Sequence, residues 1–229
     1  MEHQRDLLQP TPPAGTPRVV TREGLALRYW PLWLADAASW LVQLRTDVPW
    51  RQEHITLFGR THPIPRLTCW MGDPGCHYTY SGVRQVIEPW TASLQQLRRQ
   101  VEVAAGCRFN SLLLNHYRDG SDKLDWHADD EPELDPDQPI ASLSLGAARS
   151  FRLKPRQPSA DAGSPLSFEL GEGDLLVMDP PTQQHWLHQV PQRRRVARDR
   201  INLTFRVIRM SPDSKGGDCS GLSAIGERG

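Results

Sequence analysis

The sequence predicts an α+β fold in which a β-sandwich or jelly roll of short strands has two helices packed on one outer face. Three observations predict it. Two segments with the apolar spacing of amphipathic helices lie in the first half of the chain. After Gly106, short β-type segments follow one another between turn signals, without interleaved helices. A length of 229 residues with 38% apolar residues fits one large domain or two small ones.

The two helices are expected where apolar side chains recur every three or four residues. Residues 32–47 show this spacing, and Pro49 ends the helix because proline cannot continue it. Residues 94–104 repeat the pattern, and Gly106 is a suitable C-terminal stop. Each apolar stripe is expected to pack against the core.

The strands are expected in the second half of the chain, between turns at residues 119–120 and 171–174 and a loop at residues 155–165. We predict strands near residues 109–117, 140–146, 149–154, 166–169, 174–179 and 200–208. Strands that follow one another without helical crossovers are typical of an antiparallel sandwich, so these segments carry the jelly-roll prediction.

The expected organisation is a single domain over residues 19–210, between disordered tails at residues 1–18 and 211–229. The longest aliphatic run, at residues 112–114, is far shorter than the ~20 residues of a membrane span. No N-terminal apolar segment resembles a signal peptide, and the four cysteines form no C-x-x-C pair. We therefore expect a monomer without membrane association, in the cytoplasm or, in a eukaryote, the nucleus.

The charges balance overall but are unevenly distributed. Lysine plus arginine and aspartate plus glutamate number 27 each. Residues 119–137 hold nine acids and one lysine, whereas residues 188–209 hold seven arginines and one acid. Solvated loops would explain both runs. The alternative is a cation site in the first segment and anion recognition in the second.

A metal site is predicted at His127 and Asp129. Residues two apart in an extended chain point to the same side, so this H-x-D pair offers an imidazole and a carboxylate to one ion. His188 is the candidate for the third ligand. Two histidines and one carboxylate form the facial triad of non-haem Fe(II) oxygenases.

The predicted strand near residues 200–208 adds a second signal. Its apolar residues alternate with polar ones, which puts Arg200, Asn202 and Arg206 on one face. Inward-facing arginines are costly unless they meet an anion, and a guanidinium suits a carboxylate. This pattern indicates a dicarboxylate co-substrate that binds the metal at one end, as 2-oxoglutarate does. Asn115 and Tyr117 share a face of another strand and can line the same pocket.

Four segments together resemble the AlkB family of Fe(II)/2-oxoglutarate dioxygenases, which demethylate nucleic-acid bases. They are residues 115–120, 127–131, 140–146 and 200–206, and the resemblance extends from about residue 66 to residue 208. Within the family, residues 65–68, 78–81 and 127–132 are most similar to AlkB homologues 2 and 3. The resemblance implies a double-stranded β-helix, which is a jelly roll, with flanking N-terminal helices.

The resemblance also implies roles for individual residues. Fe(II) would be held by His127, Asp129 and His188. Arg206 would pair with the distal carboxylate of 2-oxoglutarate, and Arg200 would lie near the metal-bound end. The residues that would complete this co-substrate pocket are Asn115, Tyr117 and Asn202.

For the substrate, the resemblance implies a pocket for a base taken out of its stack. Tyr80 would stack on the base, opposite the His127 ring. The pocket would be lined by Tyr78, Asp130 and Glu131. Phe58 would be either a wedge that fills the gap left by the base or a core residue.

The implied reaction is oxidative demethylation of N-alkylated bases, such as 1-methyladenine and 3-methylcytosine, in alkylated DNA that is single- or double-stranded, with RNA as a further candidate. O2 and 2-oxoglutarate would be consumed and formaldehyde, succinate and CO2 released, as in repair of alkylation damage. The rivals are a 2-oxoglutarate oxygenase with a protein or small-molecule substrate and a non-catalytic metal-binding module. The full set of metal ligands and arginines favours an enzyme.

Overall fold

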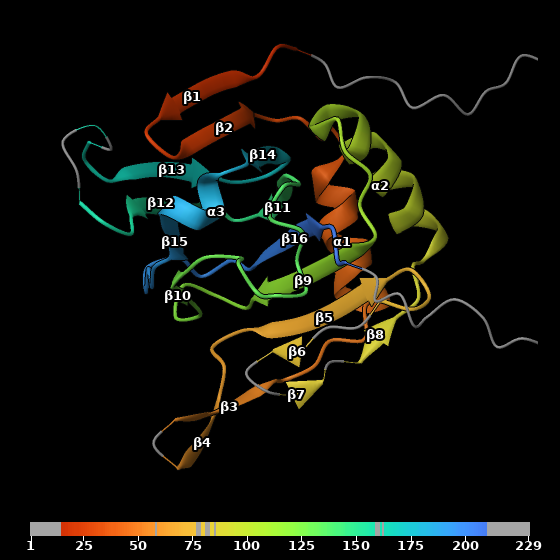
Figure 1. Ribbon diagram of the computed structural model, residues 1–229. Coiled ribbons are helices and arrows are strands. Elements are labelled where there is room, and N and C mark those ends of the chain that lie inside the picture. The colour runs from red at the N-terminus through yellow and green to blue at the C-terminus, as the bar shows by residue number, and fades with distance from the viewer. Residues whose placement is uncertain are drawn as a thin grey trace, which may run out of the picture.

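The structure is a computed structural model that describes residues 15–57, 59–76, 79–80, 83–84, 86–158, 161 and 163–209. Of residues 57, 79, 80, 83 and 84 it describes the backbone. Two β-sheets face each other, and two helices cover the outer face of the larger sheet (Figure 1). This arrangement confirms the predicted jelly roll with flanking helices.

The larger sheet has eight strands, and all its neighbours are antiparallel except β5 and β8. In spatial order the strands are β1 (Arg18–Arg22), β2 (Leu25–Trp30), β14 (Asp174–Asp179), β11 (Ile140–Gly146), β16 (Arg200–Arg206), β9 (Ser111–Tyr117), β5 (Leu67–Gly72) and β8 (Ile87–Glu88).

The smaller sheet has four strands and lies over the inner face of the larger one. Its order is β10 (Leu124–His127), β15 (Trp186–Val190), β12 (Arg149–Pro155) and β13 (Leu166–Leu170). Two hairpins complete the described strands: β3 (His54–Leu57) with β4 (Arg60–Pro63), and β6 (Thr79–Tyr80) with β7 (Val83–Arg84). The β3–β4 hairpin extends away from both sheets (Figure 1).

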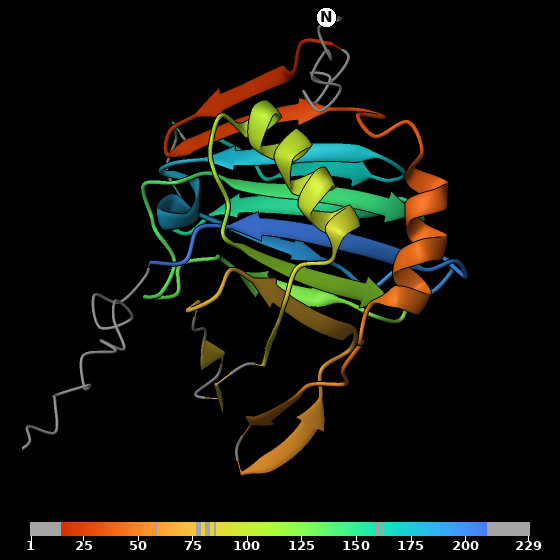
Figure 2. The same ribbon diagram turned by 90° about the vertical axis from the view of Figure 1, so that its right-hand side faces the viewer.

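The helices α1 (Ala37–Asp47) and α2 (Ala92–Ala105) lie across the outer face of the larger sheet, as Figure 2 shows. Helix α2 begins at Thr91, whose side chain accepts a hydrogen bond from the Leu94 amide, and ends at Gly106 with a φ of 69°. The third helix, α3 (Thr182–His185), is a single turn before β15.

Helix α1 begins five residues later than the sequence predicts. The Leu32 amide donates to the Asp174 side chain, and the Leu34 amide donates to the Gly173 carbonyl. Residues 32–34 therefore satisfy backbone groups through the β13–β14 turn, which a helix over these residues would not permit.

The two faces of strand β16 differ, since one packs on the helices and the other lines the space between the two sheets. Ile201, Leu203 and Phe205 face the helices and belong to a core cluster that includes residues of α1 and α2. The alternate residues of β16 point between the two sheets, where a second apolar cluster packs around Tyr117 and Trp186. The alternation that the sequence predicted for this strand is confirmed, and it delivers two arginines to the interior.

The six strands predicted for the second half of the chain are all present, with ends that differ by up to two residues. Strands β1 to β8, β10 and β15 were not predicted. Among the described helices, none combines the length and apolar content needed to cross a membrane. The domain limits at residues 18 and 210 stay a prediction, because most of both tails lies outside the described residues.

Candidate active site

The predicted metal ligands lie where β10 and β15 meet. These strands pair antiparallel, with Leu124 opposite Val190 and His127 opposite His188. Three residues on β10 thus span two on β15, which is the register of a β-bulge. The bulge matters because it places His127 and His188 directly opposite each other.

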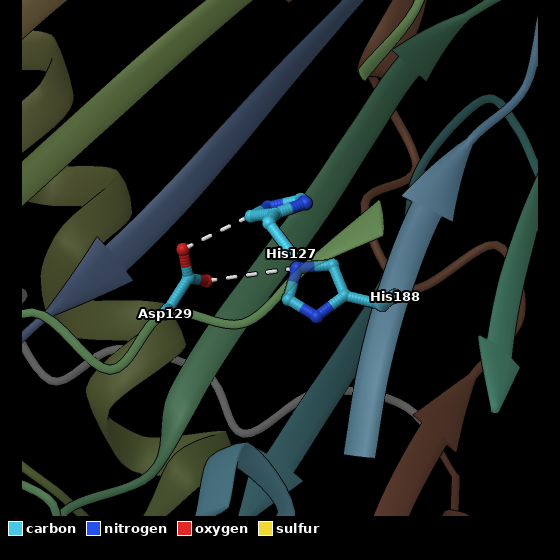
Figure 3. A group of neighbouring side chains, drawn as sticks. All are labelled: His127, Asp129 and His188. Carbon is cyan, nitrogen blue, oxygen red and sulfur yellow. Dashed lines mark ion pairs between the residues drawn. The ribbon is translucent and has the colours of Figure 1, made fainter. Parts of the chain in front are cut away.

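Asp129 joins the two histidines two residues after the end of β10. Its Oδ1 lies 4.0 Å from His127 Nε2, and its Oδ2 lies 3.8 Å from His188 Nε2. One ligand atom from each residue lies within 4.8 Å of the other two. Figure 3 shows both carboxylate oxygens turned towards the two rings. We call these three residues the metal triad.

The protonation of the metal triad suits a metal. His127 Nδ1 donates to the Asp125 carbonyl at 2.8 Å, which orients the ring so that Nε2 faces Asp129. Burial, with the neighbouring His127, lowers the pKa of His188 to about 3, so its ring is neutral. Burial alone would raise the pKa of Asp129, but the charge of Arg206 outweighs burial and lowers that pKa. Neutral imidazoles and an ionised carboxylate are the forms that bind Fe(II).

Arg206 stands beside the metal triad. Its Nη2 donates to Asp129 Oδ1, and its guanidinium lies 5.4 Å from the centre of the Trp70 ring. Both side chains of this ion pair are about 95% buried or more. A buried ion pair of this kind fixes the position of the Asp129 carboxylate.

Arg200 lies at the other end of β16, six residues or about 20 Å along the strand. It is fully buried, and its Nη2 donates to Ser144 Oγ at 2.8 Å. Among the described residues, its Nε and Nη1 have no hydrogen-bond partner. Burial lowers its pKa to about 10, and the Tyr117 ring lies 5.3 Å from the guanidinium. Such a cation calls for an anion that comes from outside the chain.

The two arginines stand in the reverse of the expected order. The resemblance placed Arg200 near the metal-bound end and Arg206 at the distal carboxylate. The structure instead puts Arg206 against Asp129 and Arg200 beside Tyr117. The reason is the direction of β16, which runs antiparallel to β9 so that Arg200 is opposite Tyr117 and Arg206 is opposite Ser111.

A cavity between the sheets connects these groups. Asn202 donates to Ser142 Oγ at 2.8 Å, and Asn115 accepts from Arg66 Nε at 2.7 Å. The residues of the predicted co-substrate pocket that line this central cavity are Asn115, Tyr117, Asn202 and Arg206, together with the metal triad. Arg200 is not among its lining residues, but its guanidinium lies 5.3 Å from the ring centre of Tyr117, which is.

Several residues at the site were missed by sequence reasoning. Arg66 and Trp70 reach the central cavity from the β5 region. Gln183, from α3, accepts a hydrogen bond from the Asp129 amide at 3.0 Å. The alternation of polar and apolar residues around β5 was an available signal for Arg66 and Trp70. No local pattern marks Gln183, because its role arises only when α3 packs beside β10.

The expected substrate residues are partly described. Glu131 lines the central cavity, and its Oε2 is buried without a hydrogen-bond partner among the described residues. Asp130 is half exposed and pairs with Arg156. Phe58 and Tyr78 lie outside the described residues, as does the side chain of Tyr80. The roles assigned to these three residues stay predictions.

Comparison with known proteins gives the family. A sequence profile described as the 2OG-Fe(II) oxygenase superfamily matches residues 27–206. The rat alpha-ketoglutarate-dependent dioxygenase alkB homolog 3 is 41% identical over 190 residues, which is 80% of this chain and 64% of the relative. The mouse DNA oxidative demethylase ALKBH2 is 37% identical over 199 residues, which is 83% of each chain.

The chain belongs to the AlkB family of 2OG-Fe(II) oxygenases. It spans less than two thirds of the rat relative's length. A solved structure titled "The structure of OsALKBH1" superposes with a TM-score of 0.55 and 16% identity, covering 83% of this chain and 99% of the other. That similarity supports the fold. In this AlkB-family chain the residue types of the metal triad fit Fe(II), and the buried Arg200 and Arg206 fit the two carboxylates of 2-oxoglutarate.

Proposed function

We propose that this chain is an Fe(II)/2-oxoglutarate-dependent dioxygenase that oxidatively demethylates N-alkylated bases in DNA. The observation that carries the proposal is Arg200. A fully buried guanidinium with two nitrogens that lack partners among the described residues is costly, unless a ligand supplies a carboxylate. Tyr117 lies beside Arg200 and also lines the cavity that contains the metal triad, so one dicarboxylate can serve both sites.

The reversed order of the arginines fixes how the co-substrate is proposed to lie. Arg200 and Tyr117 receive the distal carboxylate, and the opposite end binds beside Arg206 at the metal triad. Asn115 and Asn202 are held by Arg66 and Ser142, so their amides are oriented before the ligand arrives. Arg206 keeps Asp129 ionised and in place as a metal ligand.

Bound Fe(II), with 2-oxoglutarate and O2, supplies the oxidant that hydroxylates an N-methyl group. One oxygen atom enters the methyl group and the other enters succinate as CO2 leaves. The hydroxymethyl group then releases formaldehyde, which returns the base to its unmethylated form. The chain's own task is to hold the base so that its methyl group faces the triad, while the surrounding apolar residues exclude water.

A nucleic-acid base is the proposed substrate for two reasons. A relative with 37% identity carries the name DNA oxidative demethylase. In addition, Glu131 brings a carboxylate with an oxygen that lacks a partner among the described residues to the cavity beside the triad, and many bases methylated on a ring nitrogen are cationic. Because the cavity lies between the sheets, the base must leave its stack to enter it.

The test is aerobic incubation with Fe(II), 2-oxoglutarate and oligonucleotides that carry one methylated base, in DNA and in RNA. Mass spectrometry should detect loss of the methyl group, and succinate should form in equal amount. Asp129→Ala should abolish turnover, whereas Asp47→Ala, which removes an exposed carboxylate of α1, should not. Succinate formation without demethylation of any oligonucleotide would favour a protein or small-molecule substrate and overturn the assignment to bases.

The hairpin β3–β4 bears on the choice between single- and double-stranded DNA. Phe58 follows β3 directly and lies outside the described residues. If it is a wedge, Phe58→Ala should lower activity on duplex DNA far more than on single strands, because only the duplex has a gap to fill. Equal loss on both substrates, with a lower melting temperature, would indicate a core residue. The monomeric state and the location in cytoplasm or nucleus also stay predictions.

A further inference from the structure

A second, acidic cavity lies beside the metal triad. Its wall includes Asp129, Asp130 and Glu131, which follow one another directly after β10. Arg156 and Gln183 close another side. Asp129 and Glu131 line the central cavity as well, so the two cavities share these carboxylates. A group that approaches the triad from this side therefore meets the charge of Asp130 and Glu131.

The two carboxylates that follow the triad are in different electrostatic situations. Asp130 forms an ion pair with Arg156, with the side chains 52% and 35% exposed. Glu131 has a buried Oε2 without a hydrogen-bond partner among the described residues. One of the two negative charges is thus compensated within the chain, and the other is open to a ligand. We call Arg156 and Asp130 the rim pair.

The rim pair is anchored to the same residue as the metal triad. Arg156 Nη2 also donates to the main-chain carbonyl of Gln183 at 3.0 Å. The side chain of Gln183 accepts from the Asp129 amide at 3.0 Å. The main chain of Arg156 is fixed too, because its amide donates to the His185 carbonyl at 2.8 Å. Arg156 therefore holds the Asp130 carboxylate at a fixed place on the rim.

We propose that Arg156 is a positioning residue that holds Asp130 and compensates its charge, and so limits how strongly the site prefers cationic over uncharged methylated bases. This inference rests on the proposed function. With Arg156 present, Glu131 is the anion left to attract a cationic base. Without Arg156, the Asp130 carboxylate loses its ion-pair partner and adds a second uncompensated negative charge at the mouth of the cavity.

The expected effect is moderate because the rim pair is partly exposed. Water screens the attraction between Arg156 and Asp130 at this exposure. It also screens the attraction between Asp130 and a cationic base. We expect a change of roughly 2- to 10-fold in selectivity. The change should appear in the kcat/KM for the cationic base, while the uncharged base is nearly unaffected.

The experiment uses two bases that differ in charge but carry the methyl group at the same ring position. These are 3-methylcytosine, which is cationic at neutral pH, and 3-methylthymine, which is uncharged, each placed once in the same single-stranded DNA. The ratio of kcat/KM for the two is measured for the parent, Arg156→Met, Arg156→Gln and Arg156→Lys. Arg45→Met is the matched control, since Arg45 is a similarly exposed, ion-paired arginine on α1.

We expect the ratio to rise in Arg156→Met and Arg156→Gln, to stay near the parent value in Arg156→Lys, and not to change in Arg45→Met. Adding Asp130→Asn to Arg156→Met should reduce the rise, because the freed carboxylate is then gone. An unchanged or lower ratio, or an equal rise in the control, overturns the inference while the proposed function stands. A parent chain inactive on every methylated base overturns the proposed function, and this inference with it.

Discussion

Two buried arginines whose guanidinium groups lie near the Tyr117 ring have different surroundings. Arg149 and Arg200 are each about 1% exposed, and their guanidinium groups lie 5.7 and 5.3 Å from the Tyr117 ring. Arg149 donates to three main-chain carbonyls, those of Asp119, Asp122 and Pro191, at 2.8–3.0 Å. Arg200 donates to one hydroxyl, that of Ser144.

The difference separates a cation with a structural role from one that we propose binds the co-substrate. Arg149 ties the loop after β9 to the end of β15, and the folded chain supplies acceptors for both of its Nη atoms, so that Nε alone lacks a partner among the described residues. Arg200 keeps two nitrogens without partners among the described residues, so folding alone leaves its hydrogen-bonding capacity unused. Burial and residue type are the same in the two regions, and the partners decide the role.

The largest expected effect concerns folding. Arg149→Met should destabilise the protein by about 3–5 kcal/mol, because three carbonyls lose their donor in a buried setting. Chemical denaturation measures this free energy of unfolding. Arg152→Met, at an exposed position of the same strand, should change it by about 0.5 kcal/mol or less. A similar free energy of unfolding for both variants would show that Arg149 has no special structural role.

Arg200→Met should separate stability from function. Replacing an uncompensated buried charge by an apolar side chain is neutral or stabilising, so the free energy of unfolding without co-substrate should not fall. The binding free energy of 2-oxoglutarate should instead weaken by ~2–5 kcal/mol, so that the concentration needed for activity rises about thirtyfold or more. Arg200→Lys should restore part of the affinity, because a single ammonium cannot reproduce the planar fork. If Arg200→Met unfolds as readily as Arg149→Met, Arg200 is structural.

A third experiment measures the ligand's contribution directly. With Fe(II) and without O2, 2-oxoglutarate at a hundred times its Kd should stabilise the parent chain by ~2.7 kcal/mol. The melting temperature of Arg152→Met should rise as much as that of the parent, whereas Arg200→Met should gain only about 0.9 kcal/mol or less at the same concentration and show a correspondingly smaller rise. A full rise in Arg200→Met would place the carboxylate elsewhere.

The smallest effect is expected at Tyr117 itself. Tyr117→Phe keeps the ring that both arginines contact and removes only the hydroxyl. Stability and 2-oxoglutarate affinity should each change by about 1 kcal/mol or less. Denaturation and co-substrate titration of this variant give the two numbers. A loss as large as that in Arg200→Met would show that the hydroxyl, and not the guanidinium, is the main anchor.

The sequence was informative wherever a local pattern carries the information. Alternation in residues 200–206 predicted the inward arginines, and the H-x-D spacing with His188 predicted three residues that the structure brings together. Strand β16 and the metal triad could therefore be predicted from the sequence alone. The first strands were missed although Leu25 and Leu27 alternate with Ala26 and Arg28 after a turn at Gly24.

Features that depend on tertiary neighbours could not be predicted. Nothing local distinguishes Arg149 from Arg200, since each begins a strand. The contact of Gln183 with Asp129 depends on how α3 packs, and the order of the two arginines depends on which strand lies opposite β16. The strands from β3 to β8 were not predicted because most of them are short and the segments between them contain proline and glycine.

The bulge in β10 makes the position of a deletion in this region more important than its size. Leu124 and His127 both line the central cavity although they are three residues apart, which regular alternation does not allow. Loss of one codon at residue 125 or 126 would remove the extra residue and still leave His127 opposite His188. Loss of the codon for Ala128 would make His127 and Asp129 adjacent, so that their side chains point to opposite sides. Among descendants of this gene, the first deletion is therefore compatible with an iron site and the second eliminates it.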